Sequence, residues 1–177
     1  MKLKILRFKK VISTNTTAIR IIKNSNLNYG MVISDLQTRG RGRYGRKWIS
    51  LKGNLFVSFF YNINNFNLTM SQITERNCML VKRLISKYYK KKIIYKKPND
   101  LLINKKKICG ILQELITLNN KKFLIVGIGI NIASSPNIDN NYQTTNILHE
   151  TKKKPAIKEL MKSITISYED FFFNIKS

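Results

Sequence analysis

The sequence has little of several features on which many enzymes and most extracellular proteins depend. It contains one histidine, His149, and two cysteines, Cys78 and Cys109, with no Cys-x-x-Cys spacing. These residues do not suggest a metal site or a disulfide framework, so a reducing cytoplasm is the expected compartment. No apolar run is long enough for a signal peptide or a membrane span. We therefore expect a soluble cytoplasmic protein with no membrane partner.

Acidic residues are also scarce. The 177 residues include 33 Lys plus Arg but only 9 Asp plus Glu, a net charge of +24. Such a balance usually indicates a polyanionic partner, namely nucleic acid, an anionic membrane or an acidic protein. An AT-rich genome, which favours Lys, Asn and Ile, explains the charge equally well. Segment 39–46 is an exception, because its basic residues are clustered arginines, whereas an AT-rich genome would favour lysine.

The hydrophobic pattern predicts one domain over residues 1–177, because no repeat, Pro-rich linker or composition break divides the chain. Strand-like runs cover 3–11, 29–36, 54–61, 92–95, 101–103, 107–118 and 122–132. A short helix follows Ser13, a longer one begins at Thr69 with a Thr69/Gln72 capping box, and a last one runs from Pro155 to about Ile175. This order predicts an α+β fold, a mixed, mostly antiparallel sheet covered by helices on one face.

The glycines of segment 40–45 match the Gly-x-Gly-x-x-Gly dinucleotide fingerprint literally, and we reject that match. The fingerprint needs a helix directly after the glycines, whereas here Arg46 to Ser50 lead into a strand. The acidic residue expected about 20 positions further on is missing as well.

The same segment nevertheless has the composition of an anion site. Glycines allow positive φ and close approach of backbone amides to an anion, and Arg41, Arg43 and Arg46 add forked donors that match carboxylate or phosphate oxygens. Trp48 offers a flat face for a purine. By composition alone, a solvated basic loop that binds RNA without sequence preference fits equally well.

Residues 37–48 resemble the Gln-x-x-Gly-Arg-Gly-Arg-x-Gly-Arg-x-Trp loop of biotin–protein ligases at every defined position. Further segments resemble that family's pattern in the same order, from about residue 8 to 150: Ser-Thr-Asn at 13–15, Gly-Asn-Leu at 53–55, Lys-Lys-Pro-Asn-Asp at 96–100, Lys-Ile-Cys-Gly-Ile-Leu-Gln-Glu at 107–114 and Gly-Ile-Gly-Ile-Asn at 127–131. Lys97 stands where the family usually has Trp. We expect neither the N-terminal DNA-binding helix-turn-helix nor the C-terminal β-barrel domain of larger members, and no specific DNA binding.

The resemblance implies a fold, an activity and partners. The fold would be that of the biotin/lipoate ligase catalytic domain. ATP and biotin would give biotinyl-5′-AMP with Mg²⁺ as the accompanying ion, and the biotinyl group would pass to a lysine of the biotin carboxyl carrier protein of acetyl-CoA carboxylase. Attack of a carboxylate on a phosphate needs alignment and charge neutralisation rather than a protein nucleophile, which suits a chain poor in His and Cys.

The resemblance also assigns residues by motif position. The expected catalytic residues are Lys107, Arg43 and Asp100, with Asp100 orienting and deprotonating the acceptor lysine. The expected biotin-binding residues are Ser13, Thr14, Asn15, Gln37, Arg41, Gly42, Arg43, Lys107 and Gly110. The expected adenylate-binding residues are Arg41, Arg43, Trp48, Asn99, Lys107 and Asn131. No residue is expected to ligate a metal.

Each of these residues has an ordinary structural interpretation as well. Ser13 and Thr14 suit plain helix capping, Asn99-Asp100 a turn, Gly110 a bulge, and Lys107 a solvated lysine at the end of a lysine run. Trp48 could be a core aromatic.

Three other functions remain open: a lipoate- or octanoate-protein ligase of the same fold, a basic RNA-binding protein, and a protein that binds biotin without transferring it. The sequence does not fix the oligomeric state, with a homodimer among the options. It also leaves open the order of segment 37–52 without ligand.

Overall fold

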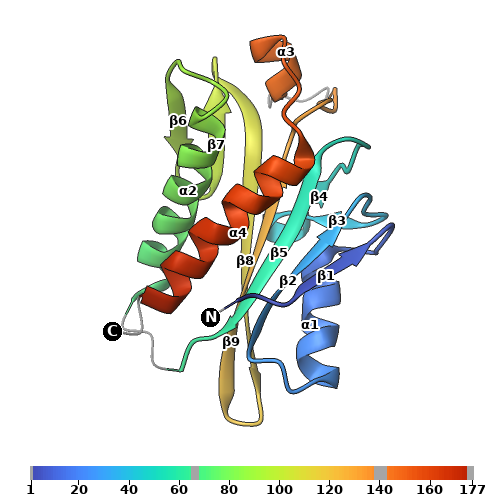
Figure 1. Ribbon diagram of the computed structural model, residues 1–177, viewed down its shortest axis with the longest axis vertical. Helices are drawn as coiled ribbons and strands as arrows, with labels where there is room; N and C mark the ends of the chain where they lie inside the picture. Colours follow the sequence, from blue (N-terminus) through green and yellow to red (C-terminus); the bar gives the residue numbers. More distant parts are fainter. Residues whose placement is uncertain (1, 65–67, 138–142, 175–177) are drawn as a thin grey trace.

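A seven-stranded sheet forms the middle of the computed structural model, which describes residues 2–64, 68–137 and 143–174 (Figure 1). The strand order is β1-β2-β5-β9-β8-β7-β6. The strands are β1 (Ile5–Phe8), β2 (Tyr29–Ser34), β5 (Leu55–Asn62), β6 (Ile93–Lys96), β7 (Asp100–Ile103), β8 (Lys106–Leu118) and β9 (Lys121–Ile130). β1 and β2 run parallel and the other neighbouring pairs antiparallel, so the expected mixed, mostly antiparallel sheet is confirmed.

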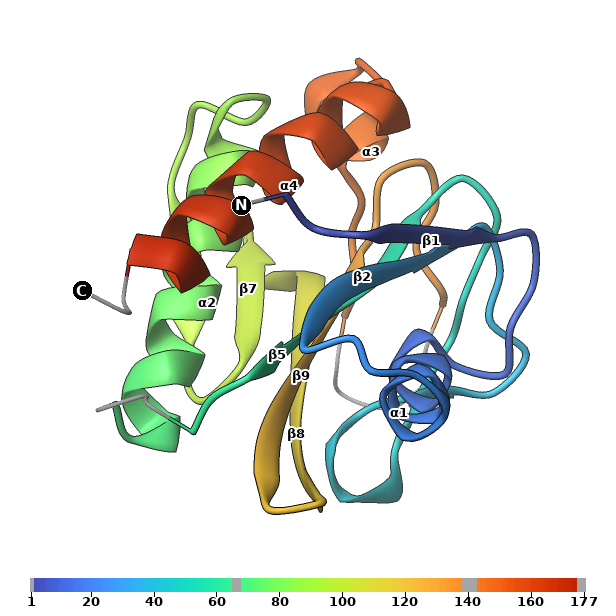
Figure 2. The same cartoon turned by 60° about the horizontal axis from the view of Figure 1, so that its bottom comes forward.

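Helices pack on both faces of this sheet. The two long ones, α2 (Met70–Ser86) and α4 (Ile157–Asn174), cover one face, as the sequence predicted. The short α1 (Thr14–Asn24) lies on the other face, where Ala18 and Ile22 pack on Val32 and Phe60 (Figure 2). Cover on both faces explains why β5 is buried along almost its whole length and mostly apolar, rather than alternating. The expectation that helices cover one face of the sheet therefore holds only for the two long helices, α2 and α4.

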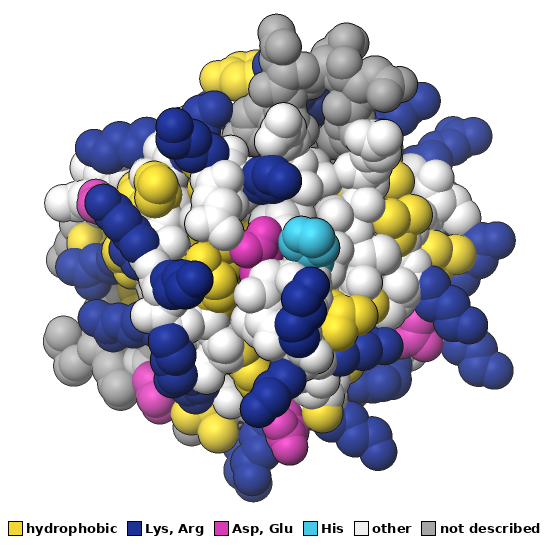
Figure 3. All heavy atoms as spheres, turned by 90° about the horizontal axis from the view of Figure 1, so that it is seen from above, with side chains coloured by type: hydrophobic (Ala, Val, Ile, Leu, Met, Phe, Trp, Pro, Cys, Tyr) yellow, Lys and Arg dark blue, Asp and Glu magenta, His cyan; other side chains and the backbone are white. Residues whose placement is uncertain are grey.

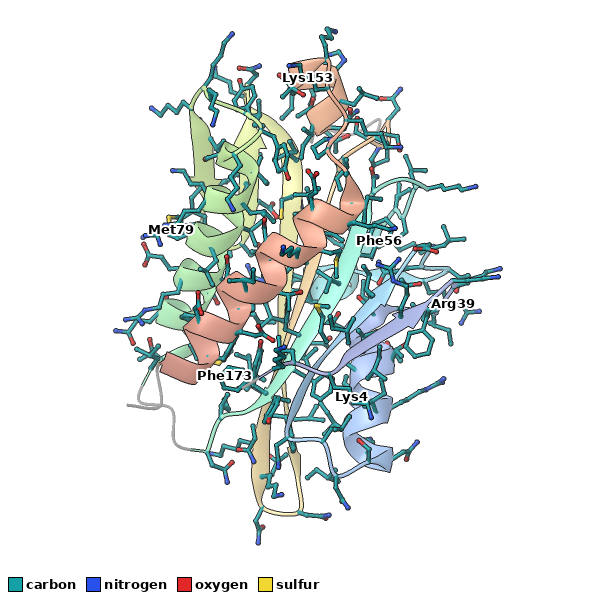
Figure 4. All side chains as sticks on the ribbon, viewed as in Figure 1. Lys4, Arg39, Phe56, Met79, Lys153 and Phe173 are labelled. Carbon is teal, nitrogen blue, oxygen red and sulfur yellow. The ribbon has the colours of Figure 1, made fainter. Side chains whose placement is uncertain are left out.

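The long helices are fixed by capping and by stacked aromatic rings. The Thr69/Gln72 capping box is present at the start of α2, as predicted. On α4, the ring of Tyr168 stacks on Phe59 of β5 at a centroid distance of 3.9 Å. Figure 4 labels Phe173 near the end of α4, where its ring meets Tyr29 of β2 edge-on at 5.2 Å. Burial of these large rings holds α4 across the sheet.

Segment 37–53, expected as a loop, contains a small two-stranded sheet. β3 (Gly40–Arg41) pairs with β4 (Lys47–Trp48), and a 3₁₀ turn at Arg43–Gly45 joins them. The chain continues from Gly45 into β4 and not into a helix, which agrees with rejecting the dinucleotide fingerprint. A five-residue helix that the sequence did not predict, α3 (Ile147–Thr151), precedes α4.

The surface is rich in cations. On the face drawn in Figure 3, Lys and Arg side chains are scattered widely and outnumber the acidic ones. Among the described helices, none has the length and apolar character that crossing a membrane requires.

Candidate functional site

A cavity of about 290 Å³ lies between the β3–β4 segment, the start of α1 and the adjoining strands β8 and β9. Every site residue predicted from the sequence lines it: Ser13, Thr14, Asn15, Gln37, Arg41, Gly42, Arg43, Trp48, Asn99, Asp100, Lys107, Gly110 and Asn131. They come from five separate stretches of the chain. The lining also includes residues that the sequence did not assign to the site: Arg46, Lys47, Ile49, Ile111, Leu112, Gly127, Ile128, Gly129, Pro136 and Thr144.

One end of the cavity is a buried polar wall at the start of α1. The Gln37 side-chain oxygen accepts hydrogen bonds from the backbone N–H of Thr14 at 2.8 Å and from its hydroxyl at 3.1 Å. The Gln37 amide nitrogen donates to Ser50 at 3.0 Å, which fixes the amide orientation. Gln37 thus satisfies a helix N–H that has no partner inside the helix.

Ser13 occupies the N-cap position of α1 but does not cap it. Its backbone is extended there and its side chain makes no capping hydrogen bond. The side chain is nonetheless buried against the cavity. The capping interpretation of Ser13 therefore does not hold, and its hydroxyl remains available to a ligand.

Asn15 extends the same wall toward β8 and β9. Its Nδ2 donates to Glu114 at 2.7 Å and to the Leu112 carbonyl at 3.3 Å, while its Oδ1 accepts from Ser58 at 2.5 Å. Its side chain lies directly on the backbone of Gly127, where a Cβ atom would collide with it. Glycine is needed at 127 because the Asn15 amide occupies the space of a side chain.

The indole of Trp48 forms an apolar floor. It covers Gly110 and Gly129, which face each other across β8 and β9. A Cβ on either glycine would overlap the ring, at 2.7 Å from Cζ3 for Gly110. Close approach of the indole to the strands therefore explains both glycines better than the bulge expected at Gly110. The indole Nε1 is buried without a hydrogen-bond partner in the described part of the chain.

Lys107 reaches into the cavity from the start of β8. Its Nζ lies 2.8 Å from the Asp100 carboxylate and 5.3 Å from the centroid of the Trp48 ring. The two charged side chains are only 20% and 15% exposed, so they are largely shielded from water. Lys107 is therefore held in place rather than solvated, and its charge acts at short range in the cavity.

Arg43 lines the cavity and is held by its neighbours. Its guanidinium donates to the Tyr44 hydroxyl at 2.8 Å and to Asn99 at 3.5 Å. Asn99 in turn donates to the Ile111 carbonyl at 2.6 Å, which ties it to β8. Lys97, which stands where the family usually has Trp, is exposed, so these bonds rather than packing against residue 97 hold Asn99.

The arginine loop, residues 39–46, was expected to point its glycine amides at an anion, and its backbone differs from that expectation in one respect. Tyr44 and Gly45 have positive φ, at 54° and 72°, whereas Gly42 is extended at −112°. The Gly42 N–H donates to the Arg46 carbonyl at 2.7 Å. This amide therefore closes the turn and does not point at an anion.

Cations dominate the cavity lining. Arg41, Arg43, Arg46, Lys47 and Lys107 face one acid, Asp100, which gives 5 − 1 = +4. An excess of positive charge at a partly buried apolar cavity favours an anionic ligand that carries a flat or aliphatic portion. Among residues 2–64, 68–137 and 143–174, no group of three or more His, Cys, Asp or Glu could hold a metal ion.

Asn131 also lines the cavity, directly after the end of β9. Its Nδ2 donates to the Thr145 carbonyl at 3.1 Å. Its Oδ1 is buried and has no hydrogen-bond partner within the described ranges. A buried acceptor in this state is a candidate contact for a ligand N–H.

Two residues that support the cavity were missed from the sequence. Glu114 was part of the 107–114 motif but received no role, and Ser58 belongs to an apolar strand. Their partners lie more than 40 positions away in the sequence, so only the folded chain brings them together. A lone acid or hydroxyl inside an apolar strand is the signal that could have found them, because such a group needs a buried partner.

The chain is similar to known proteins over most of its length. The model of the biotin/lipoate A/B protein ligase family matches residues 8–131. The bifunctional ligase/repressor BirA of Bacillus subtilis is 35% identical over 127 residues, which make up 71% of this chain and 39% of that protein. The chain therefore spans about two fifths of the length of that relative.

Two solved structures have folds similar to that of this chain. Biotin protein ligase from Aquifex aeolicus, solved with biotin and ATP, superposes with a TM-score of 0.80 at 31% identity, covering 98% of this chain and 70% of that one. P. falciparum LipL1, solved with lipoate, has a TM-score of 0.68 at 11% identity, covering 98% and 62%. The similarity to LipL1 concerns the fold alone.

Proposed function

Because the chain belongs to the biotin/lipoate A/B protein ligase family, we propose that it is an ATP-dependent biotin–protein ligase. It would form biotinyl-5′-AMP from biotin and ATP, and then transfer the biotinyl group to a lysine of a biotin carboxyl carrier protein. The observation that carries this proposal is the gathering of all the predicted site residues around one cationic cavity. The ligands of the Aquifex aeolicus enzyme support the choice of biotin.

The polar wall and the apolar lining suit the two ends of biotin. A ureido ring both donates and accepts hydrogen bonds, and Ser13, Thr14, Asn15 and Gln37 offer hydroxyl and amide groups that do the same. The aliphatic chain of biotin would lie along the apolar part of the lining, between this wall and the Trp48 indole that covers Gly110. Its carboxylate would then point toward Arg41 and Lys107.

In the first step, the biotin carboxylate attacks the α-phosphate and pyrophosphate leaves. Negative charge builds up on the phosphate oxygens, and Lys107 and Arg43, which both line the cavity, would neutralise it. Lys107 needs no reorganisation for this, because Asp100 already holds it at 2.8 Å. Trp48 would cover the adenine, and the free Oδ1 of Asn131 would accept from its amino group.

In the second step, the ε-amine of the acceptor lysine attacks the acyl carbon and AMP leaves. The amine must lose a proton, and Asp100 is the carboxylate that lines the cavity. We assign Asp100 to orienting the amine and taking its proton. Lys107 would stay on the phosphate oxygens and stabilise the departing AMP.

Mg²⁺ is expected to accompany ATP. The described residues provide no cluster of ligands for it, and Asp100, which lines the cavity, is already paired with Lys107. The ion would therefore be held mainly by the nucleotide phosphates and water, as is common for Mg²⁺. The protein's own contribution to charge neutralisation would come from its Arg and Lys side chains.

The acceptor would be the carrier protein of acetyl-CoA carboxylase, and the compartment the cytoplasm. The +24 charge would attract an acidic carrier domain and speed the encounter. Cys78 and Cys109 are free thiols, in keeping with a reducing compartment.

The proposal is tested by a transfer assay. The protein is incubated with ATP, Mg²⁺, labelled biotin and an acidic biotin carboxyl carrier domain, and in parallel with labelled lipoate. We expect label on the carrier with biotin and none with lipoate. Transfer of lipoate would indicate a lipoate ligase, adenylate without transfer a protein that only activates biotin, and neither product a binding protein of another kind.

A further inference from the structure

Glu114, on β8, joins two parts of the site that are far apart in the sequence. Its Oε2 accepts from Arg41 Nη2 at 2.5 Å and from Asn15 Nδ2 at 2.7 Å. The partners lie 73 and 99 positions away, on the arginine loop and on α1. The Glu114 side chain is 24% exposed, so its hydrogen bonds are partly shielded from water.

The bond to Asn15 sets the direction of a buried amide. Because Asn15 Nδ2 donates to both Glu114 and the Leu112 carbonyl, its Oδ1 must face Ser58 and accept from that hydroxyl at 2.5 Å. Ser58 lies 2.7 Å from the Thr14 hydroxyl, which is bound to Gln37. A carboxylate accepts and never donates, so it admits only one orientation of the Asn15 amide. The Ser58 hydroxyl proton is thereby committed to Asn15, so Glu114 and the Leu112 carbonyl together set the direction of the hydrogen bonds from Asn15 to Ser58.

The bond to Arg41 holds the arginine loop against β8. Arg41 is 42% exposed and shares its loop with Arg43, Arg46 and Lys47, which repel it. The ion pair with Glu114 opposes that repulsion and draws the β3 strand toward the sheet. It also keeps the remaining guanidinium donors of Arg41 in the cavity lining.

We propose that Glu114 is a positioning residue, whose one carboxylate oxygen fixes Arg41 and the Asn15 amide together. The two ends of the biotin site are thereby linked through a group that is not itself in the cavity lining. This inference rests on the proposed function for the identity of the ligand. The anchoring of the loop does not depend on it.

Three variants separate charge from hydrogen bonding. Glu114→Gln keeps an oxygen that can accept from both partners and loses the charge, whereas Glu114→Ala loses both. Glu75→Gln changes the net charge equally at an exposed position on α2 and serves as the control. Hydrogen bonds to charged groups contribute more than neutral ones, so Glu114→Ala should raise the KM for biotin about 10- to 100-fold. Glu114→Gln should fall between wild type and Glu114→Ala.

The split between KM and kcat distinguishes positioning from general destabilisation. Partial unfolding would lower kcat and leave both KM values unchanged, because the remaining folded molecules bind normally. Positioning should raise the KM for biotin and change the KM for ATP by less than about threefold. In the double variant with Arg41→Gln, the increase in KM for biotin should be smaller than the product of the two single effects.

A ligand-free measurement tests the anchor separately from the enzyme activity. Amide hydrogen exchange of segment 40–48 should be faster in Glu114→Ala than in wild type or Glu75→Gln. Unchanged exchange in Glu114→Ala, or a KM for biotin equal to that of wild type, would overturn the positioning role. Failure of the wild-type chain to activate biotin would instead overturn the proposed function, while the exchange data still decide whether Glu114 holds the loop.

Discussion

Adding one methyl group at Gly129 tests the arrangement of Trp48 most sharply. The Cβ of Gly129→Ala would overlap the indole Cε2 and Cζ2 atoms. β9 lies between β5 and β8 and cannot move away easily, so the indole must leave. We expect Gly129→Ala to displace Trp48 from the cavity floor and to weaken nucleotide binding.

The size of the effect follows from two estimates that agree. Overpacking of this kind costs about 1–3 kcal/mol. If the ring swings out instead, it loses roughly 100 Å² of buried apolar contact, about 2.5 kcal/mol at 25 cal/mol per Å². For a chain of this length each kcal/mol lowers Tm by about 2–4 °C, which gives a fall of about 2–12 °C.

Intrinsic fluorescence provides the assay, because Trp48 is the only tryptophan in the chain. Emission of Gly129→Ala should shift to the red as the indole meets water, and its response to ATP should diminish. Ser71→Thr is the matched control, since it adds one methyl group at an exposed position on α2. Wild-type emission and Tm in Gly129→Ala would refute the packing of the indole on the two strands.

Three further results are expected. Arg43→Ala should abolish transfer of biotin while circular dichroism stays that of wild type, and full activity would remove its assigned role. The rate of transfer to an acidic carrier should fall as salt rises from 0.05 to about 0.5 M, because screening shortens the reach of the protein's charge; a salt-independent rate would exclude electrostatic steering. Burial raises the pKa of the Cys78 thiol to about 12, and that of Cys109 is raised by burial too. Both thiols should therefore resist thiol reagents at pH 8, and the free energy of unfolding should fall as pH rises from about 9 toward 12, where the unfolded chain loses these protons and the folded chain keeps them. Rapid labelling of the native protein would contradict that burial.

Local features of the fold could be predicted from the sequence, and long-range ones could not. The Thr69/Gln72 capping box and the strand after Gly45 depend on residues a few positions apart, and both are present. The packing of α1 on the opposite face of the sheet depends on contacts between Ala18, Ile22 and strands distant in the sequence. Hydrophobic spacing indicates that a helix has an apolar face but not which side of the sheet receives it.

The same division applies to the site. Motif order identified the residues that now line one cavity, because a family pattern already contains long-range information. It did not reveal why glycines stand at 110 and 129, since the reason is the indole of Trp48 lying on them. Nor did it reveal that Glu114 serves two partners, because its bonds form only when three segments meet.

Biotin-dependent exchange of labelled pyrophosphate into ATP tests the central claim most directly, because it isolates formation of the acyl-phosphate from transfer. We predict exchange by the wild-type protein only when biotin is present, and a loss of about 100- to 1000-fold in Lys107→Ala, the range for removing one group that stabilises transition-state charge. Absence of exchange in the wild type, or a wild-type rate in Lys107→Ala, would contradict the account.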